Sequence, residues 1–133
     1  MKTLKIDHIG IAVKDLKEAA EFYRNLGLEI ESDETVDSQK VTVGFIPCGD
    51  SEIELLEATS PESPVAKFIE KNGEGIHHIA LRVDDIEAAI EEMKAKGIRM
   101  IDEEPRYGAG GGRIAFVHPK PAKGVLLELV ERK

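Results

Sequence analysis

The chain has 133 residues, enough for one domain with a hydrophobic core. Its formal net charge of −8 argues against a nucleic-acid partner, because such a partner requires a basic surface that displaces counterions from phosphates. No apolar run reaches the length of a membrane span, no signal peptide is recognisable, and the single cysteine, Cys48, excludes an intrachain disulfide. We therefore expect a cytoplasmic protein without a membrane partner.

The first half of the chain predicts one strand, one helix and three further strands. Alternating apolar residues over 4–13 indicate the first strand. Asp15, followed three residues later by Glu18, is typical of a helix N-terminus, and Gly27 marks the end of that helix. The three further strands are expected at about 28–35, 40–47 and 52–58.

The second half repeats this plan after a connector. Residues 60–73 form the connector, which we expect to hold a short helix over 65–71. Asp85 and Gly97 again delimit a helix, which follows a strand at 76–83. Further strands are expected at about 98–103, 112–118 and 124–131, with a glycine-rich loop over 105–111 between the first two of them.

The two halves are related by an offset of seventy positions. The shared pairs include Ile6/Ile76, His8/His78, Ile9/Ile79, Val13/Val83, Asp15/Asp85, Ala19/Ala89, Glu21/Glu91 and Gly27/Gly97. Near the end of each half, residues 53–57 are echoed by residues 127–131. The sequence therefore predicts a single domain of two βαβββ repeats, at about 4–58 and 75–131, neither of which could bury its apolar face alone.

Four residues of this repeat predict a metal site. His8 and His78 alternate with larger apolar residues, which places them on the strand face away from the helices. Glu128 interrupts an apolar run, where a buried carboxylate is costly unless a cation compensates it, and Glu54 lies likewise between Ile53 and Leu55. Two imidazoles and two carboxylates suit a divalent metal ion.

Packing alone offers another interpretation of each of these residues. A lone histidine on a strand is more often packed than metal-bound, but its recurrence together with glutamate is hard to explain by packing. His77 points to the other strand face, and we interpret it as structural or as a hydrogen-bond partner of a ligand. His118 has no counterpart in the first half and is left out of the metal site. We interpret Cys48 as a turn residue, and Glu52, Glu57 and Glu131 as solvated strand ends.

The pattern of His, Glu, His and Glu in two βαβββ modules resembles the glyoxalase-like vicinal oxygen chelate superfamily. The resemblance implies an α+β fold in which the modules form a curved eight-stranded mixed sheet around a metal cavity, commonly as a homodimer. It also places His8, Glu54, His78 and Glu128 on the metal-ligand positions, with cobalt, or else manganese, nickel, magnesium or zinc, as the divalent ion. Longer motifs at residues 63–69, 73–80, 105–111, 114–120 and 124–129 resemble the family that epimerises methylmalonyl-CoA.

That second resemblance implies a 1,1-proton transfer that interconverts (2R)- and (2S)-methylmalonyl-CoA through a metal-stabilised enolate. A pKa gap of about ten between the carbon acid and a carboxylate corresponds to roughly 14 kcal/mol, so the enolate must be stabilised where its charge develops. Similarity to the family suggests Glu128 as one proton-transfer group. Several members carry a second such glutamate on the third strand, where this chain has Val43, which leaves the second group open among a bound water, Glu54 and a carboxylate from another strand.

Two questions stay open at this level. The first is whether basic residues near the glycine loop hold the phosphates of CoA or the substrate carboxylate, or are simply surface charges. The candidates for substrate binding are Arg106, Gly110, Gly111, Arg113, Lys120 and Lys123. The second is the reaction, because a glyoxalase I-like enzyme acting on glutathione hemithioacetals and a non-enzymatic ligand-binding module of the same fold are alternatives. An iron-dependent dioxygenase is less favoured, because it would leave Glu54 unexplained as a fourth ligand.

Overall fold

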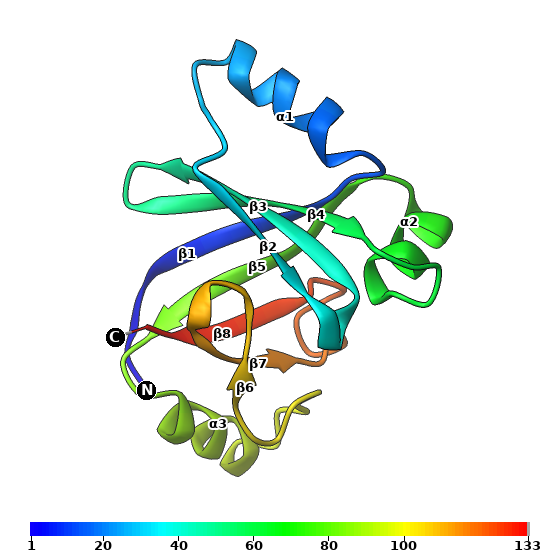
Figure 1. Cartoon of the computed structure of the whole chain (residues 1–133). Coiled ribbons are helices and arrows are strands. Elements are labelled where there is room, and N and C mark those ends of the chain that lie inside the picture. The colour runs from blue at the N-terminus through cyan, green and yellow to red at the C-terminus, as the bar shows by residue number, and fades with distance from the viewer. Residues whose placement is uncertain (133) are drawn as a thin grey trace. The chain divides into compact units, whose positions relative to one another are not determined.

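The chain folds into two βαβββ modules joined by a helical connector, as the sequence predicts. A computed structural model describes residues 1–132 (Figure 1). The first module comprises β1 (Thr3–Ala12), α1 (Leu16–Asn25), β2 (Ser32–Val36), β3 (Val41–Cys48) and β4 (Ser51–Ala58). After α2 (Pro64–Asn72), the second comprises β5 (Gly75–Val83), α3 (Ile86–Ala95), β6 (Arg106–Tyr107), β7 (Arg113–Val117) and β8 (Leu127–Glu131). Single 3-10 turns at Asp37–Gln39 and Ala109–Gly111 complete the order.

The strands belong to one eight-stranded mixed sheet with the order β2-β3-β4-β1-β5-β8-β7-β6. Within each module the first and last strands are parallel, β1 with β4 and β5 with β8. The other pairs of each module are antiparallel: β2 with β3, β3 with β4, β6 with β7 and β7 with β8. The predicted mixed sheet of two βαβββ modules is thus confirmed.

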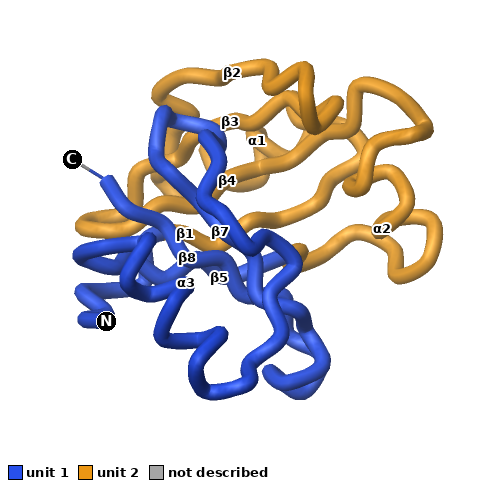
Figure 2. Tube along the Cα trace, turned by 90° about the horizontal axis from the view of Figure 1, so that it is seen from below, with its two compact units in different colours: residues 1–7, 78–133 blue, residues 8–77 orange. Residues whose placement is uncertain are grey.

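Two compact units emerge when the chain is divided by its internal contacts (Figure 2). Unit 1 comprises residues 1–7 and 78–133, and unit 2 comprises residues 8–77. The boundaries therefore fall inside β1 and inside β5 rather than between the two sequence repeats. The first seven residues of the chain belong to the same unit as the second module.

The hydrophobic core of unit 2 lies between α1 and the strands β3 and β4. It is formed by Val13, Leu16, Ala20, Ile46 and Leu55. The helix begins where the sequence predicts, because the Asp15 side chain accepts a hydrogen bond of 3.1 Å from the N–H of Glu18.

The core of unit 1 is built in the same way around α3. Asp85 caps this helix by accepting a hydrogen bond of 3.1 Å from the N–H of Ala88. The apolar stripe of α3 includes Ile86, Ala89, Ile90 and Met93. It packs with Val83 of β5, with Ala115 and Val117 of β7, with Leu129 of β8, and with Met100 in the segment after the helix.

Two predicted strands differ from the structure. The strand expected at 28–35 begins only at Ser32, and the preceding Leu28 and Ile30 pack against the core of unit 2. Residues 98–103 form no strand and contribute only an isolated bridge between Met100 and Val117. The sixth strand is instead Arg106–Tyr107, within the segment expected to be a loop.

The side chain of Asp102 explains why strand pairing stops near residue 102. Its carboxylate accepts a hydrogen bond of 2.8 Å from the N–H of Phe116. This backbone N–H is therefore not available to pair with a carbonyl group of a continuing strand.

Candidate functional site

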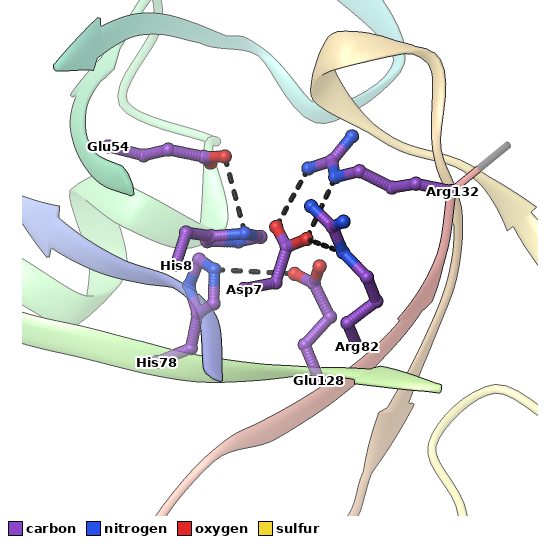
Figure 3. A network of polar contacts seen from close by, with 7 residues as sticks. All are labelled: Asp7, His8, Glu54, His78, Arg82, Glu128 and Arg132. Carbon is purple, nitrogen blue, oxygen red and sulfur yellow. Dashed lines mark hydrogen bonds and ion pairs between the residues drawn. The ribbon is translucent and has the colours of Figure 1, made fainter. Parts of the chain in front are cut away.

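Unit 2 brings together the first predicted pair of ligands, His8 and Glu54. Glu54 lies opposite Gly10 in the parallel pairing of β1 with β4, so its side chain and that of His8 extend from the same face. The Nδ1 atom of His8 lies 3.4 Å from Oε2 of Glu54, and each residue is 3% exposed (Figure 3). The two side chains form a buried imidazole–carboxylate pair.

Unit 1 builds the equivalent pair from His78 and Glu128. Glu128 lies opposite Ala80 in the pairing of β5 with β8, so the glutamate again faces the position two residues after the histidine. The Nε2 atom of His78 lies 3.3 Å from Oε1 of Glu128, and both residues are buried (Figure 3). The ring of Phe116 meets the imidazole edge-on, with the ring centroids 5.6 Å apart. The duplication therefore extends from the sequence to the register of the strands.

The distances within the two pairs fit ligands of a metal ion. Charge-assisted N–H···O hydrogen bonds are about 2.7–2.9 Å long, shorter than the 3.4 Å and 3.3 Å found here. With metal–ligand bonds of about 2.1 Å, neighbouring ligand atoms lie roughly 3.0 Å apart in octahedral and 3.4 Å apart in tetrahedral geometry. Each pair can thus supply one nitrogen and one oxygen to a divalent ion.

The predicted separation of the two strand faces is confirmed in both units. In unit 2, Ile11 and Val13 pack against the core beneath α1, whereas His8, an even-numbered position of β1, extends from the opposite face to Ile11. In unit 1, Leu127 and Leu129 pack beneath α3, while Ala80, Ile114, Phe116 and Val130 form a separate apolar cluster. Phe116 and Glu128 are paired across β7 and β8, so this second cluster lies on the face of Glu128.

Asp7 is a buried charged residue that the sequence analysis missed. Its side chain is 2% exposed, and its Oδ2 atom accepts hydrogen bonds from Nε of Arg82 at 2.8 Å and Nε of Arg132 at 2.9 Å. Arg132 Nη2 donates a further bond of 3.0 Å to Oδ1 (Figure 3). Because all three residues belong to unit 1, this network ties the start of β1 to β5 and to the end of the chain, directly before His8.

Glu57 and Glu131 were predicted to be solvated strand ends, and this prediction is wrong. Glu57 accepts a hydrogen bond of 3.0 Å from the N–H of Leu16, the first residue of α1. Glu131 accepts one of 3.0 Å from the N–H of Ile86, the first residue of α3. Each glutamate lies three residues after a predicted ligand, on the helix side of its strand. The signal was present in the sequence, because both positions are duplicated.

The remaining histidines have local surroundings of their own. In unit 2, His77 meets the ring of Phe68 edge-on with the centroids 5.0 Å apart, and burial lowers the pKa of its imidazole. In unit 1, His118 Nδ1 accepts a hydrogen bond of 3.1 Å from the N–H of Lys120 and so stabilises a turn.

Three of the predicted substrate residues line one cavity. Gly110, Gly111 and Arg113 line a cavity of about 510 Å³ in unit 1, together with Tyr107, Gly112, Glu131 and Arg132. The Arg113 guanidinium binds Glu131 and Glu87 at 3.0 Å each, and these carboxylates raise its pKa. Arg106 lies over the ring of Phe116, 5.6 Å from its centroid, and donates a hydrogen bond of 3.0 Å to Asp102. Lys120 and Lys123 are exposed residues of the turn before β8.

None of the helices within residues 1–132 is both long and apolar enough to cross a membrane.

Comparison with known proteins assigns the chain to a family. Residues 7–116 match the model of the Glyoxalase/Bleomycin resistance protein/Dioxygenase superfamily, and the chain belongs to this superfamily. It is 44% identical over 128 residues to ethylmalonyl-CoA/methylmalonyl-CoA epimerase of Cereibacter sphaeroides, covering 94% of this chain and 96% of that one.

Solved structures show the same likeness. A protein of Bacillus halodurans C-125 described as hypothetical superposes with a TM-score of 0.95 at 52% identity, covering 97% of this chain and 94% of that one. A methylmalonyl-CoA epimerase in complex with methylmalonyl-CoA and NH4+ superposes with a TM-score of 0.92 at 42% identity, covering 98% of this chain and 95% of that one.

Proposed function

We propose that this chain is a metal-dependent epimerase that interconverts (2R)- and (2S)-methylmalonyl-CoA. The observation that carries the proposal is the duplicated pair of buried histidine and glutamate, with N···O distances of 3.4 Å in unit 2 and 3.3 Å in unit 1. The similarity to epimerases over nearly the whole chain supplies the substrate class.

The metal centre of this proposal consists of His8, Glu54, His78 and Glu128, acting on one divalent ion. Each pair alone offers two donors, which is fewer than the three or four protein ligands that usually hold a catalytic divalent ion. Two pairs together supply four donors of the nitrogen and oxygen types that suit cobalt, manganese, nickel, magnesium or zinc. When bound, such an ion supplies Lewis-acid stabilisation of the negative charge that develops on the thioester oxygen.

Glu128 is the proposed group that transfers the α-proton at one face of the enolate. Its carboxylate is buried, and the apolar cluster of Ala80, Ile114, Phe116 and Val130 shares its face of the sheet. Exclusion of water by these side chains strengthens electrostatic interactions with the enolate and protects it from unproductive protonation. His78 lies beside both groups, with its Nε2 atom 3.3 Å from the carboxylate and its ring edge-on to Phe116.

Solvent-deuterium exchange at the α-carbon of (2R)- or (2S)-methylmalonyl-CoA tests the substrate, the metal and the base together. Metal-loaded protein should incorporate deuterium and epimerise either compound, and chelation should abolish both activities. Glu128→Gln should lower the rate of epimerisation of both compounds by roughly 10²–10⁴-fold, the usual contribution of general acid–base catalysis. Glu103→Gln, which changes a carboxylate that is 72% exposed in the same unit, serves as the matched control and should keep full activity. An inactive metal-loaded wild-type protein would overturn the proposal.

A glyoxalase I-like reaction is the second candidate. A probable lactoylglutathione lyase of Vibrio cholerae is 32% identical to this chain over 135 residues. This similarity supports glutathione hemithioacetals as alternative substrates. Parallel assays with the hemithioacetal of methylglyoxal and glutathione separate the two reactions. A protein that holds no metal and turns over neither substrate would favour the third alternative, a ligand-binding module.

Three further predictions accompany this proposal. We expect the two repeats, 4–58 and 75–131, to fold as one domain, because the first strand contributes to both compact units. We also expect a homodimer in the cytoplasm. Sedimentation of the purified chain at several concentrations tests the oligomeric state directly.

A further inference from the structure

Epimerisation requires a second proton-transfer group, and this inference rests on the proposed function. A planar enolate that loses its proton from one face must regain one on the other for the configuration to invert. Glu128 accounts for one face only. Val43, which is 2% exposed on β3, offers no ionisable group for the other.

The strand register of unit 2 places Glu34 beside Val43. Glu34 of β2 lies directly opposite Val43 of β3, and Val43 lies opposite Leu56 of β4. Residues directly opposite each other extend from the same face of an antiparallel sheet, and so do residues two apart on one strand. Because Glu54 precedes Leu56 by two residues, Glu34 extends from the face that carries Glu54 and His8.

Unit 1 has the same strand pairings, and the position equivalent to Glu34 also carries a charged side chain. There Phe116 lies opposite Glu128, as Phe45 lies opposite Glu54 in unit 2. Two residues earlier on the middle strand, Ile114 corresponds to Val43, and its partner on the outer strand is Arg106. Glu34 and Arg106 are thus equivalent positions of the duplication.

This equivalence separates the duplicated residues into two groups. The ligand positions hold the same residue types in both modules, whereas the outer-strand positions hold charges of opposite sign, Glu34 and Arg106. An arginine suits a carboxylate, whereas a glutamate suits proton transfer, so the two outer-strand positions can supply different chemistry.

The spacing of Glu34 suits this role. It lies two strands and two residues from Glu54, which corresponds to about 12 Å between their Cα atoms at standard strand spacings. Side chains of glutamate length extending from such positions leave room for a small acyl group. Glu34 is also exposed on the edge strand β2, where its carboxyl group can exchange protons with water between turnovers.

We propose that Glu34 is the second proton-transfer group. In one direction, the Glu128 carboxylate takes the α-proton and the electron pair of the C–H bond passes into the enolate. Protonated Glu34 then donates its O–H proton to the opposite face, where the enolate electron pair forms the new C–H bond. Glu128 is left protonated and Glu34 ionised, which is the state that the reverse reaction requires.

The test is solvent-deuterium exchange with each pure epimer, because removal of one of two bases has an asymmetric effect. Metal-loaded Glu34→Gln should lose epimerisation by roughly 10²–10⁴-fold with both epimers. It should still exchange the α-proton of the single epimer whose C–H bond faces Glu128, without inversion. Glu128→Gln should show the opposite preference. Asp33→Asn, which alters the neighbouring exposed carboxylate on the other strand face, is the matched control and should keep wild-type rates.

Two results would overturn the assignment of Glu34. The first is that the Glu34→Gln variant epimerises both substrates at rates close to wild type while the Glu128→Gln variant is inactive. The second is that the Glu34→Gln variant loses deuterium exchange with both epimers equally, as a merely structural defect would cause. Glu52→Gln covers the other non-ligand glutamate of this face and should remain active. Failure of the proposed function is distinguishable, because wild-type protein itself would then leave both epimers unchanged.

Discussion

The carboxylate of Asp7 accepts two hydrogen bonds, of 2.9 Å and 3.0 Å, from the guanidinium of Arg132, which follows it by 125 positions. The same carboxylate accepts a third bond of 2.8 Å from Arg82. Within unit 1, a single buried charge therefore connects the first strand, β5 and the last residues described. This network holds in place the backbone that continues directly into His8.

Substitution Asp7→Asn should lower the free energy of unfolding by about 3 kcal/mol, because it leaves two arginines facing a neutral group at a buried site. Urea titration of the metal-free protein measures this loss. Asp50→Asn, at an exposed turn, is the control and should change stability by less than about 0.5 kcal/mol. An unchanged midpoint for Asp7→Asn would show that the network contributes nothing to stability.

The two helix contacts of Glu57 and Glu131 give a second prediction. Glu57→Ala should destabilise the protein by about 1–2 kcal/mol, because the first N–H of α1 loses its carboxylate partner and the helix dipole loses a favourable charge. Glu57→Gln, which keeps an oxygen acceptor, should recover part of that loss. Thermal unfolding compares the two variants with Glu29→Gln, an exposed control in the same unit. Equal stability of all three variants would contradict the helix-anchoring role.

The neighbouring glycines at 111 and 112 give a third prediction, in which close packing limits one position and backbone strain the other. A Cβ atom at Gly112 would lie 2.9 Å from Cγ2 of Val130 and 3.0 Å from Nη1 of Arg132. Val130 is fully buried, so Gly112→Ala forces a shift in a packed region and should cost about 1–3 kcal/mol. Gly111→Ala meets no atom within 4 Å and should pay only about 1–2 kcal/mol for its positive φ of 80°.

Circular dichroism melting of the two glycine variants measures each of these costs. Retention of wild-type stability by Gly112→Ala would show that the loop can shift away from β8.

The duplication explains how much of this protein its sequence predicts. Both modules, both helix caps and the pairing of His8 with Glu54 and of His78 with Glu128 follow from residues repeated at a fixed offset. Asp7 escaped prediction because its partner Arg132 lies 125 residues away and neither residue belongs to the repeat. The sixth strand was misplaced because Asp102 uses its side chain, not its backbone, to take the N–H of Phe116.

Glu57 and Glu131 show a different kind of failure. Charged residues at strand ends usually face solvent, and this expectation outweighed the repeat at these two positions. A polar residue that recurs in both halves indicates a specific contact, just as a recurring ligand does. The register that aligns Glu34 with Arg106 depends on strand pairing, which residue spacing alone does not fix.

The central claim of the proposal is that both imidazole–carboxylate pairs bind a single ion. Titration of the metal-free protein with Co²⁺, followed by its visible absorption, measures stoichiometry and affinity in wild type, His8→Ala and His78→Ala. The proposal predicts one ion per chain and a loss of affinity of at least tenfold in either variant. Two ions per chain, or unchanged binding when either histidine is removed, would contradict it.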